Sequence, residues 1–195
     1  MGRDLLTLAI SKNNNNGYIL ICHDQLKSRL LSIELYRNEI ESNGYIYFDL
    51  GSVTEVEDLR EVDTSYPIGE KKLKGRFTRE QLKKFFEREK VNIEAFKLNK
   101  NMEKYSIVKI SSVEDFYVKD HKLRLKFWTS GIRNDYLVKD DRWVTYYQNN
   151  STNSEFVKKL NNYKYLFNQK QNFAFAILYK FQDYDAVWIA GLHLL

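Results

Sequence analysis

The stretch HKLRLKFWTSG, from His121 to Gly131, has the pattern of a β-strand with two different faces. Leu123, Leu125 and Phe127 alternate with a second set of side chains, so the two sets point to opposite sides of a sheet. The second set holds three cations and one indole ring: Lys122, Arg124, Lys126 and Trp128. The apolar set predicts a side that faces a core. The polar set predicts a face that is either solvated or in contact with a polyanion.

Most of the chain on both sides of this stretch also has strand character. Apolar runs are separated by short turn signals such as NNNNG at 13–17 and SNG at 42–44. The run at 173–181 is apolar on both faces, which predicts a position inside a sheet that is covered on both sides. The predicted strands are 5–11, 18–23, 30–36, 44–50, 105–110, 114–118, 122–128, 135–138, 173–181 and 187–193.

Two segments have helical signals. In residues 78–90, Thr78 stands three residues before Gln81, which is the spacing of a capping box, and an apolar stripe follows. Residues 155–163 predict a second, shorter helix with Ser154 as its cap.

The order of these elements is strands, a helix, strands, a helix and strands. A five-stranded barrel with one interposed helix is the OB plan, and 195 residues are enough for two such units. We therefore predict a mainly β protein with a few helices, built as two OB-like barrels packed together. The first would cover residues 1–100 with the helix at 78–90, and the second residues 101–195. A single α+β domain is the alternative.

Composition narrows the class of protein. Hydrophobic residues make up 43% and aromatic residues 15% of the chain, which supports a packed core and argues against global disorder. No apolar run approaches the roughly 20 residues that cross a bilayer, and no basic segment precedes MGRDLLTLAI as a signal peptide requires. We expect a cytoplasmic protein with no membrane partner. Cys22 is the single cysteine, which excludes an internal disulfide and a cysteine-based zinc site within one chain.

The charges are placed unevenly along the chain. The net charge is +5, but residues 41–70 are strongly acidic and residues 71–90 strongly basic. The basic block begins with KKLKGR, which predicts an auxiliary electrostatic arm for a polyanion. The other interpretation is that the acidic block pairs with the basic block inside the fold. The cations of this arm are Lys71, Lys72, Lys74 and Arg76.

No motif predicts a catalytic centre. The three histidines lack the spacing of metal ligands, and no Gly-rich phosphate loop is present. The pair Asp140 and Asp141 and the pair Asp183 and Asp185 are the best carboxylate candidates for metal-dependent cleavage, but both are also ordinary turn chemistry. We predict no catalytic residue, no metal and no cofactor. A metal-dependent nuclease that uses Asp140, Asp141 or Glu155 is kept as a second alternative.

Three segments of the second half carry a family resemblance: KLRLKFW, YLVKDDRW and FAFAILYKFQDYDAVWIAGLHLL. Together they resemble the dual OB-containing domain family over residues 105–195. Tyr136, Val138, Asp141 and Trp143 fit that family's step from a strand to an Asp and a nearby Trp, and 187–192 fits its last strand. The resemblance implies two OB barrels and a nucleic-acid-binding role, often beside DNA-processing or prokaryotic defence enzymes. In the first half, GYIYFDLG at 44–51 replaces the family's Gly-Trp-Ile-Arg-Pro step.

Recognition of a single strand requires cations for the phosphates and rings for the bases. We predict phosphate contacts by Lys122, Arg124, Lys126 and Arg133, stacking by Trp128 and Tyr136, and a further cation at Arg142. The predicted function is non-enzymatic binding of single-stranded DNA or RNA with weak sequence preference, as an accessory to a DNA-processing or defence system. The first alternative is a subunit that binds a protein partner, such as a helicase or nuclease, and no nucleic acid.

Overall fold

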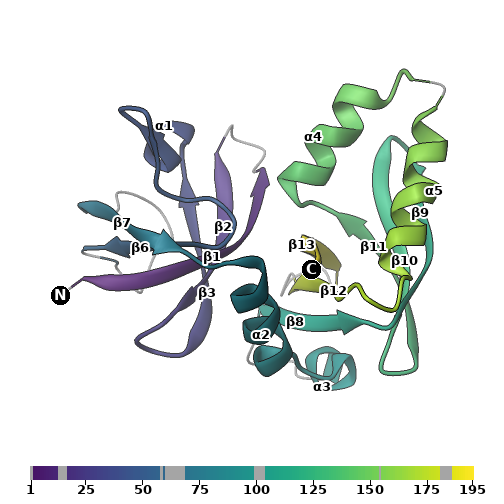
Figure 1. Ribbon diagram of the computed structural model, residues 1–195, viewed down its shortest axis with the longest axis horizontal. Coiled ribbons are helices and arrows are strands. Elements are labelled where there is room, and N and C mark those ends of the chain that lie inside the picture. The colour runs from purple at the N-terminus through teal and green to yellow at the C-terminus, as the bar shows by residue number, and fades with distance from the viewer. Residues whose placement is uncertain are drawn as a thin grey trace. The chain divides into compact units, whose positions relative to one another are not determined.

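The computed structural model describes residues 2–12, 17–57, 59, 69–98, 104–153, 155–180 and 186–195, and Figure 1 shows its helices and strands. The chain forms two compact units, Met1–Leu82 and Lys83–Leu195, which divide inside helix α2 (Arg79–Glu89). The predicted boundary near residue 100 lies within the second unit. The protein is mainly β, which confirms the predicted class.

The first unit is an antiparallel sheet with the strand order β3-β2-β1-β6-β7. A short helix and a two-stranded hairpin are inserted between β3 and β6. The elements are β1 (Arg3–Lys12), β2 (Tyr18–Asp24), β3 (Arg29–Leu35), α1 (Arg37–Ile40), β4 (Glu41–Ser42), β5 (Tyr45–Ile46), β6 (Ser52–Val56) and β7 (Lys71–Arg76).

The core of the first unit gathers apolar side chains from β1, β2, β3 and β6, with Phe48 buried among them. Cys22 belongs to this core, as its apolar surroundings in the sequence predict. Burial raises the pKa of the Cys22 thiol to about 12, and a hydrogen bond to Thr7 opposes this shift only in part. The thiol is therefore protonated at neutral pH.

The second unit has a six-stranded sheet with the order β8-β12-β13-β11-β10-β9. Neighbouring strands are antiparallel except β11 and β13, which run parallel. The elements are α3 (Ile93–Leu98), β8 (Tyr105–Ile110), β9 (Ser112–Lys119), β10 (Lys122–Thr129), β11 (Ile132–Val138), α4 (Asp141–Asn150), α5 (Phe156–Phe167), β12 (Ala174–Lys180) and β13 (Val187–Leu194), together with most of α2. Strand β12 lies between β8 and β13 and is buried over its first five residues, which confirms its predicted interior position.

The two edges of this second sheet belong to adjacent segments of the chain. Strands β8 and β9 are separated by a single residue, Ser111, whose backbone N–H donates to the carbonyl of Trp128 at 2.8 Å. Among the described residues, however, neither sheet is closed into a barrel by a ladder between its edge strands. The ladder is interrupted at Ser111 in the second unit, and in the first unit β7 pairs with β6 alone. The β-rich class is thus confirmed, but two closed barrels are not.

The helices follow their local signals. Thr78 and Gln81 form the predicted capping box, because the Thr78 N–H donates to the Gln81 side chain at 2.7 Å and the Gln81 N–H donates to the Thr78 hydroxyl at 3.2 Å. The predicted helix at 155–163 corresponds to α5, while its predicted cap, Ser154, lies outside the described residues. The residue types of Asp140 and Asp141 predict a turn, but the structure has helix α4 here, and the Asp140 side chain caps it by accepting from the Arg142 N–H at 3.1 Å.

Candidate functional site

Strands β9, β10 and β11 form a meander whose two surfaces differ as the sequence of β10 predicts. Leu123, Leu125 and Phe127 are buried in the core of the second unit. Lys122 is exposed, Arg124 and Lys126 are partly exposed, and the Trp128 side chain is 39% exposed. The register brings residues of β9 and β11 to the same side as these four. We call this side the outer face; its members are Ser112, Asp115, Tyr117, Lys119, Lys122, Arg124, Lys126, Trp128, Arg133, Asp135 and Leu137, with Glu114 at the bulge of β9.

Two tight turns set the register of this meander. Asp120 and His121 connect β9 to β10, and Ser130 and Gly131 connect β10 to β11. All four residues have positive φ, between 50° and 78°, as two-residue type I′ hairpin turns require. Three of them carry a Cβ atom, so these turns are held in a conformation that only glycine adopts without cost.

Replacing His121 by glycine is expected to raise the free energy of unfolding by roughly 0.5–1 kcal/mol, because the turn would lose its left-handed strain. Gly131→Ala should lower it by a similar amount, since the added Cβ meets open space but φ is 78°. Urea unfolding measures both. His121→Ala is the control that removes the imidazole and keeps the strain, and a gain of the same size with this variant would contradict the backbone explanation.

The two arginines of the outer face are engaged with carboxylates of neighbouring strands. Arg124 donates from Nε to Asp135 at 3.0 Å, and the Tyr117 hydroxyl donates to the same carboxylate at 2.8 Å. Partial burial lowers the pKa of Arg124, but its hydrogen bonds to Asp135 and Tyr117 outweigh burial and raise it. Arg133 forms a two-pronged pair with Glu114, whose pKa falls because of this hydrogen bond. A phosphate would have to compete with these carboxylates for both guanidinium groups.

The lysines of the outer face differ from the arginines. Lys119 and Lys122 are directly opposite each other across the β9–β10 hairpin, and no described carboxylate forms an ion pair with either ammonium. Like charges in such a cross-strand pair are destabilising. The ammonium of Lys126 lies 4.8 Å from the centre of the Tyr117 ring, a cation–π distance. The register also places Lys126 between Asp115 of β9 and Asp135 of β11. The uncompensated positive charge of the face is thus concentrated on Lys119 and Lys122. The predicted strand ends at residue 118, so Lys119 is not among the predicted binding residues, whereas β9 extends to Lys119.

The two rings predicted to stack on bases lie on opposite sides of the sheet. Trp128 is on the outer face, where its side chain also helps to lower the pKa of Glu114. Tyr136 instead packs against the core, 6.0 Å from the Phe127 ring, and donates to Asn134 at 3.1 Å. Burial raises the pKa of Tyr136 to about 12. The structure therefore does not bring Tyr136 to the proposed surface, because it alternates with Arg133 and Asp135 along β11. Tyr117 takes its place as the second ring of the outer face.

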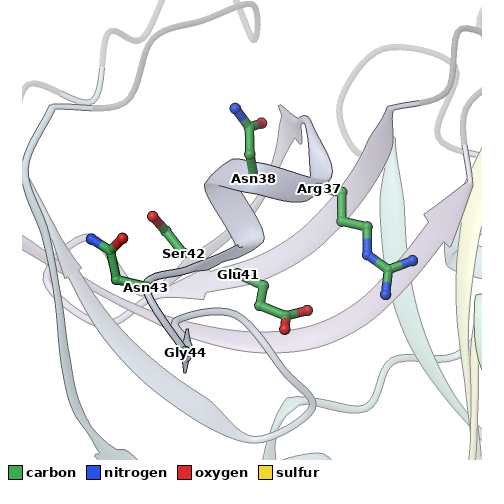
Figure 2. A pocket seen from close by; sticks show the side chains of 6 residues that line it. All are labelled: Arg37, Asn38, Glu41, Ser42, Asn43 and Gly44. Carbon is green, nitrogen blue, oxygen red and sulfur yellow. The ribbon is translucent and has the colours of Figure 1, made fainter.

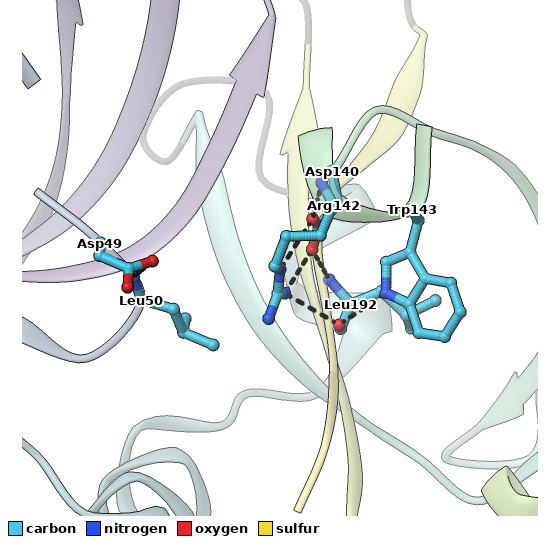
Figure 3. A network of polar contacts seen from close by, with 6 residues as sticks. All are labelled: Asp49, Leu50, Asp140, Arg142, Trp143 and Leu192. Atoms are coloured by element: carbon cyan, nitrogen blue, oxygen red, sulfur yellow. Dashed lines mark hydrogen bonds and ion pairs between the residues drawn. The ribbon is translucent and has the colours of Figure 1, made fainter. Parts of the chain in front are cut away.

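Arg142 also lies apart from the outer face, in a network at the start of α4 (Figure 3). Asp140 is 1% exposed and accepts from the Arg142 side chain at 2.6 and 3.1 Å and from the Leu192 N–H at 2.8 Å. The carbonyl of Leu192 accepts from Arg142 at 3.2 Å and from the Trp143 indole at 3.1 Å. This network joins α4 to β13. The buried aspartate of the motif is therefore Asp140, whereas the family resemblance pointed to Asp141.

The segment KKLKGR forms β7, an edge strand of the first unit. Lys74 is paired with Glu55 at 2.9 Å, and Arg76 with Asp49 at 3.0 Å. Lys71 lies with its ammonium 5.2 Å from the centre of the Tyr47 ring. Part of the basic block is thus compensated by the acidic block, as the second interpretation of these charges predicts. The segment is a strand and not a free arm.

The other candidate sites do not bring side chains together around a ligand. Within the described ranges, no three or more His, Cys, Asp or Glu side chains are grouped so that they could hold a metal ion. Asp183 and Asp185 lie outside those ranges. A pocket of about 460 Å³ is lined by polar residues of α1 and the β4–β5 hairpin, but its side chains point in different directions and do not converge on a ligand (Figure 2). The helices that the structure describes are too short or too polar to cross a membrane.

The chain was compared with protein-family models and with curated proteins, and no family model and no curated protein matches it. The resemblance to the dual OB-containing domain family therefore stays a prediction.

Proposed function

We propose that the protein binds single-stranded nucleic acid, DNA or RNA, with weak sequence preference, on the outer face of β9, β10 and β11. The observation that carries this proposal is the pair Lys119 and Lys122, which has no carboxylate partner among the described residues and lies on the same face as Lys126 and the exposed ring of Trp128. Lysines supply mobile point charges for phosphates, and an exposed ring supplies a stacking surface for a base. The cost of two opposed ammonium groups is offset when an anion lies between them.

The strand order supports an OB-type arrangement of the second unit. If β8 and β9 are two halves of strand 1, then strand 1 pairs with strand 2 (β10) and with strand 4 (β12), and strand 3 (β11) lies beside strand 5 (β13). In the first unit, β1, β2, β3, β6 and β7 follow as strands 1 to 5 in the order 3-2-1-4-5. OB-folds bind oligonucleotides on the face of strands 2 and 3 and on the loop between strands 1 and 2. Those positions correspond to β10, β11 and the turn flanked by Lys119 and Lys122.

The salt dependence of binding tests the proposal. For single strands, the logarithm of affinity falls with the logarithm of salt concentration by about 0.7 per phosphate contact. Three lysine contacts predict a slope of about −2, which corresponds to roughly 20-fold weaker binding between 50 and 200 mM salt. Contacts by Arg124 and Arg133 as well would give about −3.5. Fluorescence anisotropy with labelled single-stranded DNA, single-stranded RNA and duplex DNA measures these slopes.

Combined replacement of Lys119, Lys122 and Lys126 by alanine should bring the slope close to zero. Lys158→Ala is the matched control, because it removes one strongly exposed lysine from α5 and should leave the slope unchanged. An unchanged slope in the triple variant would exclude the outer face as the binding surface. If the unaltered protein bound none of the three nucleic acids even at low salt, the proposal would fail and the protein-binding alternative would take its place.

From the family resemblance we also propose a role beside DNA-processing or defence enzymes. Of the carboxylates considered for a nuclease, Asp140 has both oxygens engaged by Arg142 and by the Leu192 N–H. Glu155 is exposed and lies 3.8 Å from Lys158. Neither position favours cleavage over binding.

A further inference from the structure

A second group of cations lies around the ring of Phe173, in the same unit as the outer face. The ammonium of Lys83, from α2, lies 3.7 Å from the centre of this ring, and the ammonium of Lys109, from β8, lies 4.9 Å from it. At such distances an aromatic ring attracts an ammonium group and orients it. Phe173 therefore gathers cations from two separate elements. We call Lys83, Lys109 and Phe173 the α2–β8 cluster.

The α2–β8 cluster lies on the same side of the second sheet as the outer face. Lys109 is directly opposite Phe175, and its sequence neighbour Val108 faces the core. Lys109 and Phe175 therefore point away from the core. Phe173 continues the extended chain before β12, because its backbone exchanges two hydrogen bonds with Leu195, at 2.7 and 2.8 Å. Its side chain is two residues from Phe175 and shares that side.

Ser111 links the α2–β8 cluster to the exposed ring of Trp128. The Ser111 N–H donates to the Trp128 carbonyl at 2.8 Å. Ile110 is opposite Ala174, so the same register continued by one residue sets Ser111 beside Phe173. Neighbouring strands are about 5 Å apart, which places the backbones of Trp128 and Phe173 roughly 10 Å from each other. A ligand that lies on Trp128 thus reaches the cluster by crossing Ser111, which is exposed.

The charges of the α2–β8 cluster leave an excess of positive charge. Glu87 accepts from Lys109 at 2.6 Å and also from Lys90. Partial burial raises the pKa of Glu87, but these hydrogen bonds outweigh burial and lower it. No described carboxylate forms an ion pair with Lys83, so three ammonium groups share one carboxylate. The Lys109 side chain is 40% exposed and Lys83 is partly exposed, so an anion can approach both.

The other charged residues of α2 do not cancel this excess. Glu89 is paired with Arg88 at 2.6 Å. Glu80 follows Arg79 and stands four residues before Lys84, the spacing at which opposite charges meet on a helix. Each of these carboxylates thus has a cation of its own beside it in the helix.

We propose that the α2–β8 cluster is a phosphate-binding subsite for the single strand that stacks on Trp128, in which Lys83 and Lys109 each contact the phosphate backbone. The inference rests on the proposed function of the outer face. The strand would run along β10 from Lys119 and Lys122 at one end to Trp128 at the other, and from there across Ser111 to α2. It adds two phosphate contacts to the three lysine contacts of the outer face.

Strand length and salt dependence together test the inference. Lys122 and Trp128 are separated by about 20 Å along β10, and a stacked strand advances about 3.4 Å per nucleotide. Oligothymidylates of about 4 and about 16 nucleotides, the limits for one OB unit, therefore stay within the outer face and extend beyond it, respectively. Three contacts predict a salt slope of about −2 with the short strand, and five predict about −3.5 with the long one.

Lys83→Gln removes one contact and should bring the long-strand slope to about −2.8. The affinity would then fall about 50-fold between 50 and 200 mM salt, compared with about 130-fold for the unaltered protein, while the short-strand slope stays the same. Replacing Lys109 by Gln as well should return the long-strand slope to about −2. Lys83→Arg keeps the charge and should keep the slope. Lys84→Gln is the matched control, because Lys84 is the next residue of the same helix and is exposed.

Fluorescence anisotropy with both labelled strands separates failure of this inference from failure of the proposed function. If the unaltered protein binds neither strand, or if replacing Lys119, Lys122 and Lys126 leaves the short-strand slope unchanged, the proposed function itself fails. If the short strand binds as proposed for the outer face, and Lys83→Gln changes the long-strand slope no more than Lys84→Gln does, the outer face stands and the phosphate subsite is overturned.

Discussion

Replacement of Asp140 by alanine is expected to lower the free energy of unfolding by about 2–4 kcal/mol, because Asp140 is buried while the Arg142 side chain beside it is partly exposed. Three losses contribute. The cap of α4 disappears, at a cost of about 1 kcal/mol. The Leu192 N–H loses its acceptor at a cost of about 1–3 kcal/mol. The Arg142 guanidinium loses its carboxylate as well. Equilibrium denaturation by urea, with the slope checked for two-state behaviour, measures the change.

Asp140→Asn should fall between the native protein and Asp140→Ala, because its amide oxygen still accepts one hydrogen bond but carries no charge. Glu155→Ala is the matched control, since it removes an exposed carboxylate that precedes the next helix and should cost within about 0.5 kcal/mol. A loss below about 1 kcal/mol for Asp140→Ala would mean that α4 does not depend on this network.

Truncation of Trp143 to alanine is expected to cost about 3 kcal/mol, the lower end for buried tryptophans because the side chain is only partly buried. The Trp143 ring packs edge-to-face on Phe116 at 5.2 Å and on Tyr163 at 4.8 Å, and lies 5.9 Å from Phe167. It therefore joins α4 to β9 and α5 in one cluster, and its indole also donates to Leu192. Thermal and urea unfolding both report this loss.

Trp128→Ala provides the comparison within the same protein. Trp128 lies on the outer face, so its removal should change stability by well under 1 kcal/mol while it weakens nucleic-acid binding. The opposite ranking of the two variants in stability would contradict the assignment of one tryptophan to the core and the other to the surface. Trp143 and Asp140 share Leu192, so their combined replacement should cost less than the sum of the two single changes.

Much of the local structure follows from the sequence because its causes are local. The alternation in β10 separates Leu123, Leu125 and Phe127 from the charged residues by the period of two of any strand. The capping box of α2 involves Thr78 and Gln81, three residues apart. Helix α4 was missed although a signal exists: Asp140 precedes Trp143, Tyr146 and Tyr147, whose helical spacing outweighs the turn chemistry of two aspartates.

The same parity rule would have removed Tyr136 from the predicted binding residues. Within β11, Tyr136 lies an odd number of residues from Arg133 and Asp135, and therefore faces the core. Extending the predicted strand by one residue, from 118 to the turn before β10, would have placed Lys119 on the outer face. These two corrections were available from pattern alone.

The sequence by itself determined the β-rich class, the two-faced strand β10 and the caps, since these depend on residues within a few positions of one another. Which cations remain uncompensated was decided only by tertiary structure. Arg124 meets Asp135, eleven residues away, and Arg133 meets Glu114, nineteen residues away, because the β9–β11 register places them side by side. The same register sets Lys119 against Lys122 with no carboxylate partner among the described residues. A count of charges along the chain contains no information on such pairings, because charges at hydrogen-bonding distance neutralise each other whatever their separation in sequence.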